Sequence, residues 1–588
     1  MPSRSRLIDR VPPGLGWDLL ACGLLLVAAL LLRLQGLDAL LPHHPEADAW
    51  IVEQTIRLSD AEVSGETRQA IQGKYPLLLA DVVRAIDGDQ TRAFDANRTP
   101  EEHRAAASAP FLAARRVLAL LSALAAPLTY LLARTFMERP AASLAGAWVA
   151  TSLLHVSLSV QARPHAPLAT FCVLTLLLAI QAARSRGPGW LIPLALASAF
   201  ATGTLQSGAL TILPAFLATA LVIKRHPRTG AVAATISALL AIGILLRAYP
   251  IDIGAHAGAA RPQAAIAEEV VAEEVIATSE VKGIGEEPTT IRLHTHRIQL
   301  DRFRGRGALV LAQALISSDP LLALLASLGA LGLLRKGKWR PTTPEGWILA
   351  SFAIPFAACF AAYDLSHPRF FVPLLPLVAL FAAHGPARRL AAWGFLILSF
   401  TTAARFAWLR TQPDSLERTA EWIVREAAEE LTLVLAWRSL PLIEGRDELV
   451  EEDAWSRSTW ERYQLGARNG DLHAEAPTRF LSVKEGLAVS RGQEGAALLA
   501  ARLGDPAVTF VAAAVEPLLD DERSWNSIAM QEQVLAGAGA RPVARIPESP
   551  WTAPGPYPTL TLRGWSALEV WRRRCLGPQI EIHRLPRR

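Results

Sequence analysis

The stretch GWDLLACGLLLVAALLLRLQGL, residues 16–37, is an almost unbroken apolar run of the length that crosses a lipid bilayer as a helix. It follows a basic segment, MPSRSRLIDR, and no small-residue cleavage site comes after it. We therefore predict an uncleaved first transmembrane helix rather than a signal peptide. The chain of 588 residues is 51% hydrophobic, and Arg-rich and Pro-rich breaks separate its apolar blocks. This pattern is typical of a polytopic membrane protein.

Further apolar runs of adequate length follow along the first two thirds of the chain. If each run is one crossing, the sequence predicts about eleven transmembrane helices. They are expected near 16–36, 111–133, 140–160, 166–184, 190–205, 207–223, 231–247, 308–334, 346–363, 370–385 and 390–409. TGTLQSG joins the fifth and sixth runs, and these two are also compatible with one kinked or re-entrant unit.

Basic residues cluster in short loops between these runs, and these loops share one side of the predicted membrane. They are RSR (184–186), KRHPR (224–228), RKGKWR (335–340) and ARR (387–389), all on the side of the N-terminus. The positive-inside rule makes that side cytoplasmic. The net charge of +5 is then explained by orientation in the membrane, and we expect no nucleic-acid partner. The four cysteines suggest neither a disulfide framework nor a metal site.

This orientation places three polar regions outside the membrane. They are the loops 37–108 and 248–306 and the tail 411–588, which follows a membrane domain of residues 1–410. The tail alternates charged helical stretches with strand-like runs: LTLVLAW (431–437), AVTFVAAA (507–514) and QIEIHRL (579–585). We therefore predict an α-helical polytopic membrane protein with a small extracytoplasmic α/β domain at its C-terminus.

Two carboxylates, Glu46 and Asp48, lie in LLPHHPEADAW (40–50), just beyond the first predicted span. A carboxylate near the edge of the hydrocarbon is partly desolvated, which raises its basicity toward that of a general base. The alternative is that these residues only begin a solvated loop. His43 and His44 precede them and could bind zinc together with His165, although unpaired surface histidines explain the same pattern.

Two more polar clusters are predicted at outer helix ends. HVSLSVQARPHAP (155–167) contributes Arg163 and His165, and YDLSHPRFFVPLLP (363–376) contributes His367 and Arg369. A guanidinium at such a position can hold a phosphate by paired hydrogen bonds, or it can simply end a helix. Three clusters on one side of the membrane indicate a shared site.

The order of these segments resembles that of bacterial GT-C glycosyltransferases, the group that includes the protein O-mannosyltransferases (glycosyltransferase family 39) and the aminoarabinose transferase. The resemblance covers about residues 20 to 420. It is carried by LLRLQGLDALLPHHPEADAWIVEQTIRL (31–58), GKYPLLLADVV (73–83), ARRVLALLSALAAPLTYLLARTF (114–136), LLHVSLSVQARPHAPLATFCVLTLLLAI (153–180) and HPRFFVPLLPLVALFAA (367–383).

The resemblance implies an enzyme of the bacterial cytoplasmic membrane that transfers a sugar from a polyprenyl-phosphate donor, with inversion, to a glycan, lipid or protein acceptor outside. Either carboxylate of the first outer loop would be the base. Phosphate would be bound by Lys74, Arg163 and Arg369, and Tyr75 would shape the pocket for the sugar or the lipid. His165 and His367 would belong to the same binding site.

The chain departs from the family pattern at two positions. Ala47 separates two acids that are usually adjacent, so which of them is the base stays open. His165 stands where the family often has an Asp, and if that Asp helps to hold a divalent cation, a His suits a transition metal better than magnesium. A transporter of lipid or sugar is an alternative function, and so is a non-catalytic binding or assembly subunit.

Overall fold

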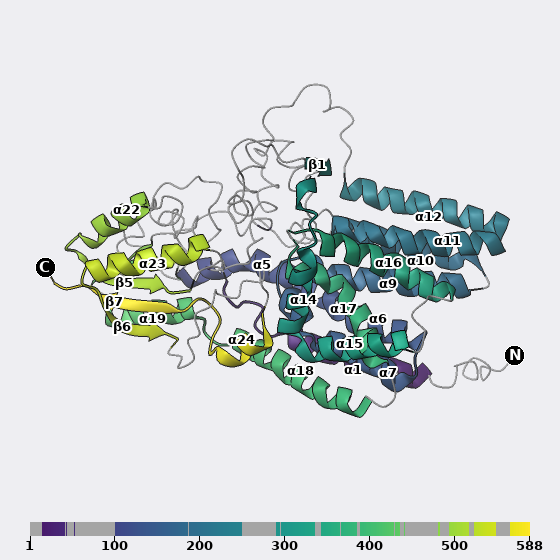
Figure 1. Cartoon of the computed structure of the whole chain (residues 1–588), viewed down its shortest axis with the longest axis horizontal. Coiled ribbons are helices and arrows are strands. Elements are labelled where there is room, and N and C mark those ends of the chain that lie inside the picture. The colour runs from purple at the N-terminus through teal and green to yellow at the C-terminus, as the bar shows by residue number, and fades with distance from the viewer. Residues whose placement is uncertain are drawn as a thin grey trace, which may run out of the picture.

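The computed structural model in Figure 1 combines a long helical bundle with a smaller region that contains a sheet. It describes residues 15–41, 43, 52, 100–185, 187–249, 290–293, 296–335, 343–364, 366–384, 389–427, 430–435, 440, 480–482, 493–516, 522–547 and 565–587. Of the predicted site residues, Glu46, Asp48, Lys74, Tyr75 and His44 lie outside these ranges.

The bundle is built from the predicted apolar runs. Its helices are α1 (Leu15–Leu34), α5 (Pro100–Ala123), α6 (Ala125–Arg134), α7 (Arg139–Thr151), α8 (Leu153–Ser159), α9 (His165–Arg184), α10 (Leu191–Thr204), α11 (Ile212–Arg225), α12 (Pro227–Ala248), α14 (Gly307–Ser318), α15 (Pro320–Arg335), α16 (Pro344–Ala362), α17 (Leu375–Ala383) and α18 (Arg389–Arg410). In the part of the chain that the structure describes, short 3₁₀ segments lie between some of them: η4 (Pro188–Trp190), η5 (Gln206–Thr211), η8 (Leu300–Arg302) and η9 (Pro368–Leu374).

Within the described residues, seven helices are long and apolar enough to cross a membrane, and up to nine if each of two bent pairs counts as one span. Every predicted run contains a helix, which supports the prediction of a multi-pass membrane protein. The expected number of eleven is higher because two runs form shorter helices. α10 has 14 residues, and the segment Pro368–Ala383 also falls below spanning length. α10 and α11 are separate helices joined at η5.

Charged side chains hold helix ends together at the end of the bundle nearest the N-terminus. Asp18 accepts hydrogen bonds from Arg139 at 3.1 Å, from Arg134 at 3.3 Å and from Tyr130. Arg184 donates to Glu345 at 2.9 Å. Arg184 also donates to the carbonyl of Thr135 at 3.2 Å, so the start of α1, the α6–α7 connection, the end of α9 and the start of α16 share one end of the bundle.

The C-terminal region forms a five-stranded sheet of order β4-β3-β5-β7-β6. β3 (Leu431–Leu435) pairs in parallel with β4 (Phe480–Ser482) and with β5 (Val508–Ala514), while β7 (Ile580–Arg584) is antiparallel to β5 and to β6 (Arg541–Ile546). The helices of this region are α19 (Ser415–Glu426), α22 (Gln493–Leu503), α23 (Glu522–Gly537) and α24 (Ala567–Arg572). The three strands predicted from the sequence are β3, β5 and β7, so the small α/β region is confirmed.

A separate antiparallel pair, β1 (Thr290–Leu293) and β2 (His296–Gln299), lies within the predicted outer loop 248–306. In Figure 1, α18 runs from the bundle toward the sheet region, and α24 lies beside it. Trp571 Nε1 donates to Thr402 Oγ1 at 3.1 Å, which fastens α24 to α18. The two regions are thus in direct contact.

Candidate functional site at the outer helix ends

The segment before Arg163 begins with a broken helix. α7 and α8 meet at Ser152 with a bend of 50°. A break of this kind leaves carbonyl groups of the first helix and amide groups of the second without partners inside the helices. All seven residues of α8 are buried, so these backbone groups need partners from the protein.

Asp319 supplies acceptors for the start of α8. Its Oδ2 accepts from Ser152 Oγ at 2.7 Å and from the amide of Leu154 at 3.2 Å, while its Oδ1 accepts from the amide of Leu153 at 2.9 Å. Asp319 is 4% exposed and itself occupies a break, because α14 and α15 bend there by 118°. Two bent helix pairs therefore meet at their breaks through one carboxylate.

Arg33 of α1 supplies donors for the end of α7. Its guanidinium donates to the carbonyl oxygens of Ala150 at 2.9 Å and Val149 at 3.3 Å. It also bonds to His155 Nδ1 at 2.9 Å and donates to Ser159 Oγ at 3.2 Å. The guanidinium nitrogens of this fully buried arginine therefore have hydrogen-bond partners, as the burial of a charge requires. Arg33 is not among the predicted site residues, although an Arg inside the apolar run LLLRLQGL is a recognisable signal.

The predicted residues Arg163 and His165 follow directly on α8. Both are buried, with 1% and 2% of their surface exposed, and His165 is the first residue of α9. The amide of Arg163 donates to the carbonyl of Gln161 at 2.7 Å, which makes a tight turn before α9. The buried α8 and its two charged partners therefore fix the position of this turn.

The third predicted cluster meets the second one at Phe370. The Phe370 ring lies 5.7 Å from the ring of His165 and 5.7 Å from the ring of His367, measured between centroids. Arg369 is 5% exposed, and its Cζ lies 5.3 Å from the same ring. Phe360 of α16 stacks on Phe370 at 4.8 Å. The structure thus brings His165 of the second cluster and His367 and Arg369 of the third cluster to one aromatic ring. These residues lie far apart in the sequence.

Other buried arginines gather near the same helix ends. Arg115 of α5 donates to the carbonyl of Ala39 at 2.9 Å, and Arg410 at the end of α18 donates to the carbonyl of Leu32 at 2.6 Å. The backbone of Arg410 also lies against Gly36, whose φ is 58°. A side chain on Gly36 would meet the Arg410 carbonyl oxygen at 2.5 Å. This end of the bundle is therefore rich in guanidinium groups, which suit an anionic ligand.

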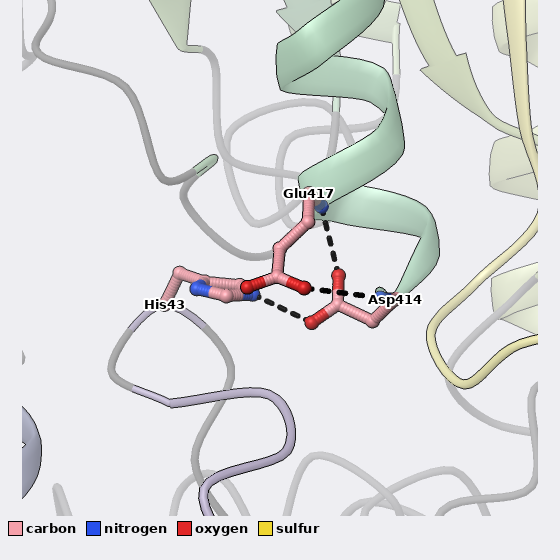
Figure 2. Close-up of side chains that lie close together, drawn as sticks. All are labelled: His43, Asp414 and Glu417. Atoms are coloured by element: carbon pink, nitrogen blue, oxygen red, sulfur yellow. Dashed lines mark hydrogen bonds and ion pairs between the residues drawn. The ribbon is translucent and has the colours of Figure 1, made fainter. Parts of the chain in front are cut away.

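Among the described residues, His43 pairs with an acidic residue that begins the C-terminal region. It is buried, and its Nε2 lies 2.9 Å from Asp414 Oδ2, at the start of α19 (Figure 2). Among the described residues, the group of side chains able to hold a metal ion is His43, Asp414 and Glu417. The predicted combination of His43, His44 and His165 is not tested, because His44 lies outside the described residues.

Residues 107–251 match the family model described as dolichyl-phosphate-mannose-protein mannosyltransferase. The matched segment contains α7, α8, Arg163 and His165. The match supports the resemblance to the protein O-mannosyltransferases over this part of the chain. No curated protein matches the chain.

The solved structures to which the chain is similar include three from two proteins. The archaeal oligosaccharyltransferase AglB from Archaeoglobus fulgidus, in complex with an inhibitory peptide and a dolichol-phosphate, is 13% identical, with 85% of this chain and 69% of that chain covered and a TM-score of 0.40. ArnT from Cupriavidus metallidurans in the apo state is 11% identical, with 90% and 96% covered and a TM-score of 0.40. The same protein bound to undecaprenyl phosphate is 12% identical, with 87% and 84% covered and a TM-score of 0.37.

Proposed function

We propose that this chain is a membrane glycosyltransferase that transfers a sugar from a polyprenyl-phosphate donor, with inversion, to an extracytoplasmic glycan, lipid or protein. The observation that carries the proposal is the meeting of His165 with His367 and Arg369 around Phe370, with the buried Arg163 two residues before His165 in the chain. The name of the family that matches residues 107–251 includes a donor sugar carried on dolichyl phosphate. This supports a donor of the same class for the present chain.

The chemistry of such a donor explains why the site lies at helix ends. A polyprenyl tail stays in the bilayer, while the phosphate lies at the interface and becomes the leaving group. Developing negative charge on that phosphate is stabilised by guanidinium groups that are already in place. Arg163 and Arg369 are proposed to do this, with Lys74 as a third cation.

The acceptor hydroxyl needs a base, and Glu46 or Asp48 is proposed for this role. Residues just before these two carboxylates in the sequence are held in place by contacts with other segments. His43 is fastened to Asp414, and Arg115 holds the turn at Ala39. The chain before Glu46 is thereby held at the same end of the bundle.

We further propose that the protein lies in the bacterial cytoplasmic membrane with its N-terminus in the cytoplasm and the region 411–588 outside. The basic loops 184–186, 224–228, 335–340 and 387–389 support this orientation. A reporter enzyme that works only outside the cytoplasm should then be active when it is fused after residue 588. A reporter that works only in the cytoplasm should be inactive at the same position.

The test is transfer of radiolabelled sugar from a panel of polyprenyl-phosphate donors by membranes that contain equal amounts of each variant. Arg163→Lys and Arg369→Lys keep the charge but lose paired donation, so transfer should fall by about tenfold or more. Arg184→Lys is the matched control, because Arg184 pairs with Glu345 at the opposite end of the bundle. Glu46→Gln and Asp48→Asn should identify the base, since only one should abolish transfer.

One structural feature also occurs in transporters. The α14–α15 pair bends by 118° at the buried Asp319, and broken helices with ionisable groups are common in transport proteins. Here the carboxylate accepts hydrogen bonds from Ser152 and from two amides. Uptake of labelled lipid or sugar by proteoliposomes, without any transfer product, would favour transport. Neither transfer nor uptake would favour a binding or assembly subunit.

A further inference from the structure

Two segments that are 371 residues apart meet where the first outer loop contacts the C-terminal region. His43 comes from the loop after α1, and Asp414 and Glu417 come from the first turn of α19 (Figure 2). His43 is 3% exposed and Asp414 is 2% exposed. This contact is therefore removed from solvent, unlike an ordinary surface ion pair.

A capping box accounts for part of the arrangement. Asp414 Oδ1 accepts from the amide of Glu417 at 2.8 Å, and Glu417 Oε2 accepts from the amide of Asp414 at 3.2 Å. Such reciprocal bonds are a common way to begin a helix. They do not require a histidine, and they leave Asp414 Oδ2 directed at His43 Nε2.

The imidazole is directed at the two carboxylates. Among the described residues, His43 Nδ1 has no hydrogen-bond partner, so the ring makes its polar contact through Nε2. One ligand atom from each of His43, Asp414 and Glu417 lies within 4.8 Å of the other two. Figure 2 shows the Glu417 carboxylate beside the His43 ring.

We propose that His43, Asp414 and Glu417 bind a divalent transition-metal ion of the zinc class, and that this ion fastens the first outer loop to the C-terminal region. One imidazole nitrogen and two carboxylate oxygens are ligands that zinc accepts, at about 2.0–2.2 Å each. Magnesium and calcium favour sites made of oxygen ligands alone. A dication also offsets the two carboxylate charges at a buried place.

This site is separate from the proposed transfer chemistry. Its role is to join two segments, and it uses neither Arg163 nor Arg369. Metal binding and sugar transfer can therefore be measured independently, so failure of one proposal leaves the other standing.

The experiment uses the full-length protein in detergent, treated with a chelator and then dialysed against Zn²⁺, with metal content measured by mass spectrometry. We expect one zinc per chain and a thermal unfolding midpoint that rises with added Zn²⁺. Asp414→Asn and Glu417→Gln keep a side-chain oxygen for the capping box but remove the carboxylate. Each should weaken zinc binding by about tenfold or more while leaving a folded protein.

His583→Gln is the matched control. His583 Nε2 lies 3.2 Å from Glu581 Oε2 on β7, so it is also a histidine–carboxylate pair, but it is not in a three-ligand group among the described residues. This variant should keep its zinc. Absence of stoichiometric zinc in the wild type, or equal zinc in Asp414→Asn and Glu417→Gln, would overturn the proposal. So would stabilisation by Mg²⁺ or Ca²⁺ in place of Zn²⁺.

Discussion

Two junctions bury charged side chains at a helix start: the Ser152 junction inside the bundle, formed by Ser152, Asp319 and Arg33, and the His43 junction beside the C-terminal region, formed by His43, Asp414 and Glu417. At the Ser152 junction, Asp319 is occupied by the hydroxyl and amides of the α8 start, and Arg33 is occupied by carbonyls of α7. At the His43 junction, Asp414 caps α19 with one oxygen and faces His43 with the other.

The difference shows how a buried carboxylate can serve either the backbone or a ligand. A carboxylate whose oxygens are taken by amides and a hydroxyl is a structural cap. A carboxylate that turns an oxygen toward an imidazole and a second carboxylate has the donor set of a metal site. Three variants or treatments separate these two roles, and a fourth concerns another histidine–carboxylate pair.

The largest expected effect is that of Asp319→Ala. It leaves the amides of Leu153 and Leu154 and the Ser152 hydroxyl buried without their acceptor, which should cost about 3–5 kcal/mol of stability. Thermal unfolding and size-exclusion profiles in detergent should show severe loss of folded protein. Asp505→Ala is the control, because Asp505 accepts only an exposed amide, from Ala507. Equal behaviour of the two variants would contradict the capping role.

Zinc removal should have the next largest effect. A ligand at about 100 times its dissociation constant stabilises the folded state by about 2.7 kcal/mol, so a chelator should lower the unfolding midpoint of the wild type. The midpoint of Asp414→Asn should respond about half as much or less, because a site that binds zinc tenfold more weakly keeps only about 1.4 kcal/mol of this stabilisation. A midpoint that a chelator leaves unchanged in the wild type would indicate that the His43 junction is only a hydrogen-bonded contact.

Arg33→Lys tests the other half of the Ser152 junction. An ammonium group cannot reproduce the planar set of donors to Ala150, Val149 and Ser159, and we expect a loss of about 1–2 kcal/mol. Thermal unfolding measures it, with the exposed Arg425→Lys as control. If the two substitutions cost the same, the geometry of the guanidinium is unimportant there.

The smallest effect concerns pH and His583. Burial lowers the pKa of His583, while Glu581 partly offsets this shift. The unfolded chain therefore binds a proton more readily, and stability is lost as the pH falls below about 6.5, the ordinary histidine value. His583→Gln should flatten the decline between pH 7 and pH 5 by less than about 1 kcal/mol. An unchanged slope in denaturation midpoints across that range would show that another group is responsible.

Much of the fold could be predicted because its signals are local. An apolar run predicts a helix, and a short β-branched run such as LTLVLAW predicts a strand, whatever lies elsewhere in the chain. The bend at Asp319 could not be predicted in this way. The run 308–334 has the sequence pattern of one span. The carboxylate of Asp319, which divides it, can be buried because Ser152 and the first amides of α8 donate hydrogen bonds to it.

The candidate site was predicted in part. His165, His367 and Arg369 were predicted as polar residues at helix ends, but Phe370, the ring beside which all three lie, was not. An aromatic residue in HPRFF looks like ordinary apolar sequence, and only the packing of η9 against α9 gives it a central place.

The sequence by itself determined the membrane-embedded helices, the strands of the small α/β region and the polar residues at helix ends, because each depends on neighbours within a few turns. Only the tertiary structure decided which charges are partners. Arg33 meets α7, Asp319 meets α8, and His43 meets Asp414 across 371 residues. The physical reason is that a buried charge is stable only beside its partner, and chain spacing does not specify which distant group that partner is.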